Sequence, residues 1–152
     1  MKLRYRILLF FFLLTWCAGI FSGYFASINK NILLAHPFIK KSYSLVCHQE
    51  ESKLIYFDGY ATNTCARCTG IYIGLLLASL LSIFKTTSKI PGIKYLFIFA
   101  VPMLIDVILY SIGIYKYSKE AAFATGLLFG SIGFLYFYTG VNELLNEIRL
   151  RE

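Results

Sequence analysis

The chain has 152 residues, of which 58% are hydrophobic and only 15% are charged. Soluble domains average about 45–50% apolar and about 25% charged residues, so this composition excludes an ordinary soluble domain and predicts a protein embedded in a lipid bilayer. The formal net charge of +7 is scattered among hydrophobic runs, a pattern that favours contact with anionic lipid and argues against nucleic acid as a partner.

Four stretches are apolar enough to cross a membrane as helices, which takes about 20 residues. They cover residues 7–28, 68–84, 95–114 and 121–141. The apolar run of the first stretch is longer than the ~7–15 residues of a signal-peptide core, and no small-residue cleavage site follows it. We therefore predict an uncleaved anchor and an all-α protein: a four-transmembrane-helix bundle that forms one integral membrane domain over residues 1–152.

Basic residues beside the first span predict its orientation. Lys2, Arg4 and Arg6 directly precede the apolar run, and positive charges at the end of the first span usually stay in the cytoplasm. With four spans, both termini are then cytoplasmic and the loop over residues 29–67 lies outside. We expect a multi-pass protein of a bacterial inner membrane with this orientation.

Three of the spans carry pairs of glycines four residues apart. Such pairs let helix backbones approach closely in lipid, where no hydrophobic effect drives helices together. They either compact one chain or join protomers of a homo-oligomer, and the spacing alone does not separate the two. The pairs are Gly19 and Gly23, Gly70 and Gly74, and Gly126 and Gly130.

The loop between the first two spans shows two local patterns. After Pro37, apolar residues from Phe38 to Cys47 recur at helical spacing, which predicts a short amphipathic helix on the bundle or membrane surface. Asp58-Gly59 lies between aromatic residues and predicts a small hairpin. Such a hairpin would return the chain, so that Cys65 and Cys68 meet Cys47 and His48.

The Cys-His pair and the C-x-x-C pair are the strongest functional signal in the chain. Three thiolates and one imidazole, from Cys47, His48, Cys65 and Cys68, form a common tetrahedral zinc set, and iron also accepts thiolates. Adjacent helical residues do not easily chelate one ion together, so water, a substrate or Asp106 is an alternative fourth ligand to His48. We predict a zinc or iron site at the outer membrane face.

Two other interpretations of the same cysteines stay open. Cys65 and Cys68 at a helix start would have tuned thiol pKa values and could exchange disulfides, and the arrangement looks like that of quinone-linked disulfide-forming membrane enzymes. Under that alternative, quinone is the cofactor. A static disulfide in a structural or partner subunit is the third interpretation. The residues do not decide whether the protein is an enzyme.

Asp106 is a carboxylate inside the third span, where insertion of a charge costs about 2.5–3.5 kcal/mol. We expect it to face the bundle interior beneath the cysteines, as a proton relay, a metal ligand or a partner for Arg67. With Cys65 and Cys68 it completes the candidate catalytic residues.

These motifs resemble those of a family of small prokaryotic integral membrane proteins without an assigned activity. The family is defined by a CHQ element, here Cys47-His48-Gln49, and a CxRCxGxYxG element, here Cys65 to Gly74. Pro102 and Asp106 in the third span extend the resemblance, as does the segment from Thr125 to Gly130 in the fourth. The resemblance implies a membrane protein carrying a cysteine site but supplies no reaction.

Overall fold

The computed structural model describes residues 3–28, 30–84 and 92–151. It confirms a mostly α-helical chain with four helices long and apolar enough to cross a membrane, the fourth over Lys119–Leu144 of its last helix. In chain order the elements are α1 (Leu3–Ile20), α2 (Ser22–Ile28), α3 (Lys30–Ser44), the short 3-10 helix η1 (Glu51–Lys53), β1 (Leu54–Phe57), β2 (Tyr60–Cys65), α4 (Ala66–Phe84), α5 (Ile93–Ser111) and α6 (Lys119–Arg151).

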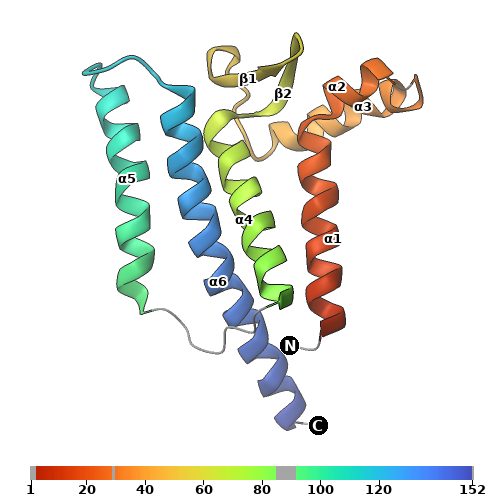
Figure 1. Cartoon of the computed structure of the whole chain (residues 1–152), viewed down its shortest axis with the longest axis vertical. Coiled ribbons are helices and arrows are strands. Elements are labelled where there is room, and N and C mark those ends of the chain that lie inside the picture. The colour runs from red at the N-terminus through yellow and green to blue at the C-terminus, as the bar shows by residue number, and fades with distance from the viewer. Residues whose placement is uncertain (1–2, 29, 85–91, 152) are drawn as a thin grey trace.

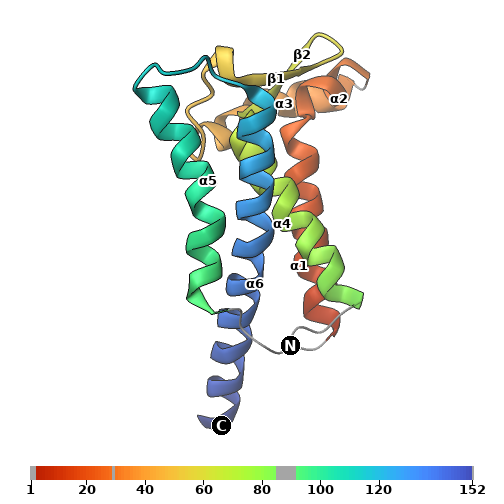
Figure 2. The same cartoon turned by 60° about the vertical axis from the view of Figure 1, so that its left-hand side comes forward.

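The four long helices stand side by side in the order α1, α4, α6, α5 (Figure 1). Both chain ends lie at one end of this bundle, while α2, α3 and the β1–β2 hairpin cover the other end, as the turned view also shows (Figure 2). Many large apolar side chains point outward, among them Phe12, Leu81 and Phe97. Exposed apolar surface of this extent fits a lipid surrounding.

Helices α4 and α6 form the closest pair, and their glycines explain why. Gly70 and Gly74 of α4 lie directly against the α6 backbone at Phe123 and Leu127. Gly126 and Gly130 of α6 lie in the same way against the α4 backbone. A Cβ at any of the four positions would overlap a carbonyl oxygen of the other helix. The predicted glycine pairs of these two spans therefore serve a contact within one chain.

The half of the bundle nearer the chain ends packs around an aromatic pair. Phe134 and Tyr138 of α6 stack with ring centroids 6.1 Å apart and are almost fully buried. Arg6 of α1 is also buried; its guanidinium donates to the Ser82 carbonyl at 3.1 Å and lies 5.6 Å from the centre of the Tyr138 ring. This basic residue, predicted only as a topological signal, also ties α1 to α4 and α6.

The predicted first span is divided in the structure. Helix α1 ends at Ile20, and α2 begins at Ser22 and turns across the end of the bundle (Figure 1). Asn63 of β2 donates both to the Gly19 carbonyl at 2.9 Å and to the Ser22 hydroxyl at 2.7 Å. These bonds satisfy the Gly19 carbonyl and the Ser22 hydroxyl where α1 ends. Hydropathy of the span could not reveal this end, because the partner comes from a distant strand.

The loop elements follow the predicted pattern with shifted limits. The surface helix begins at Lys30, earlier than predicted, and includes Pro37. The hairpin is confirmed: β1 and β2 pair antiparallel, and the turn residues Asp58 and Gly59 have φ of 52° and 84°. Two positive φ values are what a two-residue type I′ hairpin turn requires.

Candidate metal centre

Cys47 is positioned by the end of α3. The backbone N–H groups of Val46 and Cys47 both donate to the Tyr43 carbonyl, at 3.1 and 2.9 Å, and so close a tight turn after the helix. Gln49 follows with a φ of 50°. Its side-chain amide donates to the Lys40 carbonyl at 3.1 Å and to the Asn63 carbonyl at 2.8 Å. The turn is thereby pinned to α3 on one side and to β2 on the other.

Cys65 and Cys68 come from the junction of β2 and α4. Cys65 is the last residue of the strand, and Cys68 lies in the first turn of the helix. The junction is fixed by Thr64, whose fully buried hydroxyl lies 2.8 Å from the hydroxyl of Thr69. Strand and helix are thus held so that both sulfurs reach the same side of the chain.

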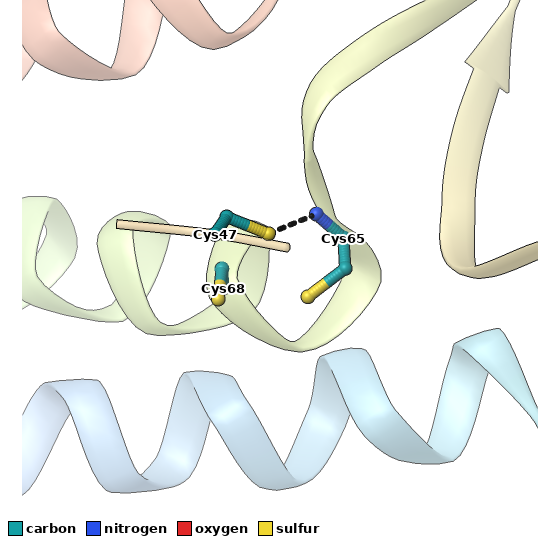
Figure 3. A group of neighbouring side chains, drawn as sticks. All are labelled: Cys47, Cys65 and Cys68. Atoms are coloured by element: carbon teal, nitrogen blue, oxygen red, sulfur yellow. Dashed lines mark hydrogen bonds between the residues drawn. The ribbon is translucent and has the colours of Figure 1, made fainter. Parts of the chain in front are cut away.

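The three sulfurs converge at the hairpin end of the bundle. The Sγ atoms of Cys47, Cys65 and Cys68 all lie within 4.8 Å of one another. Figure 3 shows the Cys47 sulfur beside the start of α4, where it accepts the Cys65 backbone N–H at 3.2 Å. All four cysteines of the chain are described, and each is free. The predicted meeting of Cys47 with the C-x-x-C pair is therefore present in the structure.

The cluster stabilises one negative charge at Cys47. Hydrogen bonds from the thiols of Cys65 and Cys68 lower the pKa of the Cys47 thiol, and the backbone N–H groups of Cys65 and Gln49 add to this effect against the cost of burial. The Cys47 sulfur raises the pKa of Cys65 in turn. The arrangement is a thiolate that accepts hydrogen bonds from two thiols, a state ready to exchange two protons for a cation.

His48 does not join the sulfurs. Its side chain is exposed, and among the described Cys, His, Asp and Glu residues the group of converging ligand atoms contains only the three cysteines. Adjacent residues point in different directions, and the turn after α3 directs Cys47 inward and His48 outward. The site as it stands offers three sulfur ligands.

Asp106 is buried and belongs to a polar link beside the cluster. Its carboxylate forms an ion pair with Arg67, the residue between the two C-x-x-C cysteines, and accepts a hydrogen bond from the Tyr115 hydroxyl. Of the roles predicted for Asp106, the partner of Arg67 is the one that these contacts match. The carboxylate lies outside the group of converging sulfurs.

The loop from α5 to α6 contributes residues that the sequence did not single out as functional. Tyr117 lies where Cys65, Arg67, Asp106 and Cys68 all act on its hydroxyl electrostatically, and burial raises its pKa to about 12. The Lys53 ammonium lies over the Tyr110 and Tyr117 rings, 4.8 and 5.7 Å from their centres. The only sequence signal was that aromatic and basic residues occur in both loops.

Cys17 lies apart from the cluster. It is buried in α1, and its thiol donates to the Tyr72 carbonyl of α4 at 3.4 Å. It is absent from the converging group, and its small side chain packs within the bundle. The fourth cysteine supplies an internal control for tests of the other three.

Comparison with known proteins agrees with the predicted resemblance. The family model described as "Predicted membrane protein (DUF2085)" matches residues 47–136. The chain belongs to this family. An uncharacterised protein of Methanocaldococcus jannaschii is 33% identical over 137 residues, which are 86% of this chain and 87% of the relative. No solved structure matches the chain significantly.

The family match begins at the first cysteine of the cluster. It includes Cys47, the C-x-x-C pair, Asp106 and Tyr117, and it leaves out α1, α2 and α3. The family description agrees with the four apolar helices, so the protein is an integral membrane protein with the three clustered cysteines at one end of the bundle. Neither the description nor the relative's name adds a reaction.

Proposed function

We propose that the protein binds one transition-metal ion, zinc or iron, through the thiolates of Cys47, Cys65 and Cys68. The observation that carries the proposal is the convergence of the three Sγ atoms within 4.8 Å. A tetrahedral site with metal–sulfur bonds of about 2.3 Å holds its sulfurs about 3.8 Å apart. Small rotations of the three side chains would therefore bring the sulfurs onto one ion.

The chemistry of the surroundings supports a cation at this position. The N–H groups of Cys65 and Gln49 already favour the deprotonated form of Cys47, and thiolates are soft ligands that select zinc or iron over magnesium or calcium. Because α3, β2 and α4 each fix one part of the cluster, the site needs little ordering when the ion binds.

The orientation is part of the proposal. The cluster lies at the end of the bundle opposite to both termini (Figure 1). Arg4 and Arg6 at the start of α1 favour a cytoplasmic N-terminus, which would put the sulfurs on the outer face of the cytoplasmic membrane. A reporter enzyme fused to the C-terminus tests this; activity on the outer side would reverse the orientation.

Metal analysis of the purified full-length protein tests the site directly. We expect about one zinc or iron per chain, with three thiols protected from a thiol reagent until a chelator is added. Replacing Cys65 or Cys68 by Ser should abolish stoichiometric metal, while the matched change Cys17→Ser should leave it unchanged. Equal loss in all three variants would contradict a site built from the cluster.

Metal binding should depend on pH in a defined direction. Cys47 is the thiolate of the cluster, whereas the pKa of Cys65 is raised by the negative sulfur beside it. Binding must therefore release protons from Cys65 and Cys68, so apparent affinity should rise with pH, by up to about 100-fold per pH unit while both thiols are protonated. Zinc competition with a chromophoric chelator between pH 6 and pH 8 measures the slope. Affinity independent of pH would contradict ligation by these thiols.

Membrane thiol–disulfide exchange remains the second candidate, favoured by the Cys47 sulfur. A quinone can oxidise the stabilised thiolate and a neighbouring thiol to a disulfide and become quinol, and a substrate dithiol can then reduce that disulfide by thiol–disulfide exchange and leave as a disulfide. Quinone would be the electron acceptor under this alternative. Protein without metal, in which Cys65 and Cys68 are oxidised to a disulfide when a quinone is added and are reduced again by a dithiol, would favour this candidate. A static disulfide without metal would leave a structural role.

A further inference from the structure

Two buried polar atoms beside the cysteine cluster lack hydrogen-bond partners. Among the described residues, the Tyr117 hydroxyl and the Nε of Arg67 are shielded from solvent and have no partner. Buried polar groups in native proteins are almost always paired, so each exception points to something that the protein binds there. Arg67 lies between Cys65 and Cys68 in the chain, and the Tyr117 hydroxyl is near enough to both cysteines for them to act on it electrostatically, which makes a shared explanation economical.

The position of Tyr117 connects its free hydroxyl to the cluster. Cys65 is the first electrostatic influence on this hydroxyl after burial itself, followed by Arg67, Asp106 and Cys68. Figure 3 shows the Cys65 and Cys68 side chains at the start of α4, with the Cys47 sulfur beside them. Tyr117 lies two residues before the start of α6, in the α5–α6 loop.

Among the residues that the structure describes, no fourth protein ligand joins the three sulfurs. The converging group holds three sulfurs, His48 is exposed, and Asp106 is committed to Arg67 and Tyr115. Structural zinc sites are usually closed by four protein ligands, whereas three protein ligands leave a position for water or substrate. A divalent ion with three thiolates carries one net negative charge, which favours a neutral ligand over an anion at that position.

We infer that the fourth ligand of the metal is an exogenous oxygen donor, water in the resting protein, held by hydrogen bonds from Tyr117 Oη and Arg67 Nε. This inference rests on the proposed metal site and deepens it, because an exchangeable position turns a structural centre into one that can bind a substrate. The substrate class is a small molecule with a neutral oxygen donor, such as a carbonyl or hydroxyl group.

X-ray absorption of the zinc-loaded, full-length protein counts the ligands. We expect three sulfurs at about 2.3 Å and one oxygen or nitrogen at about 2.0–2.1 Å. The light-atom ligand should persist in His48→Ala. Its loss in that variant, or a shell of sulfurs alone, would overturn the inference while leaving a metal site in place. Failure of any metal to bind stoichiometrically would instead refute the proposed function.

Cobalt substitution tests the role of Tyr117. The Co²⁺ form should change its visible spectrum when imidazole or acetamide is added, since these neutral probes can replace water. Tyr117→Phe should retain one Co²⁺ per chain but weaken acetamide binding by about 10-fold, the value of one hydrogen bond. The matched change Tyr110→Phe removes the hydroxyl of a neighbouring ring, which packs edge-on against the Tyr117 ring with centroids 5.4 Å apart, and should alter neither spectrum nor affinity.

The outcomes separate the alternatives cleanly. Two results together would assign the fourth position to His48 and overturn the inference. The Co²⁺ spectrum would change in His48→Ala but not in Tyr117→Phe, and the unaltered protein would show no spectral change when imidazole or acetamide is added. An equal change in Tyr117→Phe and Tyr110→Phe would show a general effect of the loop and overturn it as well. If Tyr117→Phe does not fold, the absorption measurement on wild type and His48→Ala still decides.

Discussion

Helices α4 and α5 both lie beside α6, but they are held in the bundle by different means. Helix α4 meets α6 through glycines on both sides, backbone against backbone. In α5, whose residues are all described, Asp106 is the one buried side chain, and it pairs with Arg67 of α4. Helix α4 is therefore a rigid platform for Cys65 and Cys68, while the buried attachment of α5 is a polar link to α4 that a single change can release.

Breaking the glycine contact should have the largest effect. Gly70→Leu places a side chain where the α6 backbone already lies, so the helices must separate. We expect a loss of about 3 kcal/mol or more in the free energy of unfolding, together with loss of the metal site that α4 carries. Thermal unfolding in detergent measures it.

A glycine from the same bundle gives the matched control. Nothing lies within 4 Å of a Cβ built at Gly133 of α6. Gly133→Ala should therefore keep or slightly raise stability, because alanine has the higher helix propensity by about 1 kcal/mol. Equal damage from the changes at Gly70 and Gly133 would contradict a specific close approach.

Releasing α5 should come next. Asp106→Asn removes the charge that pairs with the Arg67 guanidinium and leaves that cation partly buried without its partner, at a cost of about 3 kcal/mol. Since α4 keeps its glycine contact with α6, metal content should fall far less than stability. Crosslinking of cysteines introduced on α5 and α6, in a background with Cys17→Ala, reports their separation.

A reversed pair sharpens that test. The double change Arg67→Asp with Asp106→Arg should recover part of the stability that either single change loses, as expected for residues in direct contact. Removing an exposed carboxylate with Glu120→Gln should have little effect on the α5–α6 distance. If the double variant is as unstable as the sum of its parts, the ion pair is not what holds α5.

The sequence predicted the glycine contact between α4 and α6 better than the polar link around Asp106. Glycines four residues apart marked the faces of α4 and α6, and Asp58-Gly59 marked the hairpin, because both are local patterns with one steric cause. The sites of Tyr115 and Tyr117 depend on how one loop folds back over α4. No periodicity in the sequence encodes that, so these tyrosines were indistinguishable from interfacial aromatic residues.

The same reason explains the division of the first span. Hydropathy measures whether residues 7–28 tolerate lipid, and they do, but the helix ends where Asn63 captures the Gly19 carbonyl from a distant strand. His48 shows the converse case. Its proximity to Cys47 along the chain suggested a shared site, whereas the turn after α3 separates the two side chains.

Changing the joint between α1 and α2 should have a moderate effect. Asn63→Ala removes the hydrogen bonds to the Gly19 carbonyl and the Ser22 hydroxyl, and we expect a loss of about 1–2 kcal/mol. Because Asn63 also lies two residues before Cys65, the hairpin should loosen and the three thiols should react faster with a reagent. The rate of thiol modification in the metal-free protein measures this, and an unchanged rate would show that the hairpin is held by other contacts.

Cys17→Ala should have the smallest effect. It changes the contact between α1 and α4. The change removes a weak hydrogen bond to the Tyr72 carbonyl and a small buried group, at a cost of about 1 kcal/mol. Cys17 lies on the α1 side of α4, away from both the glycine contact and the sulfur cluster. Metal stoichiometry and the α5–α6 crosslink should therefore be those of the unaltered protein. A loss of metal in Cys17→Ala would mean that α1 also determines the geometry of the cluster, and the rigidity assigned to the α4–α6 pair would then belong to all three helices.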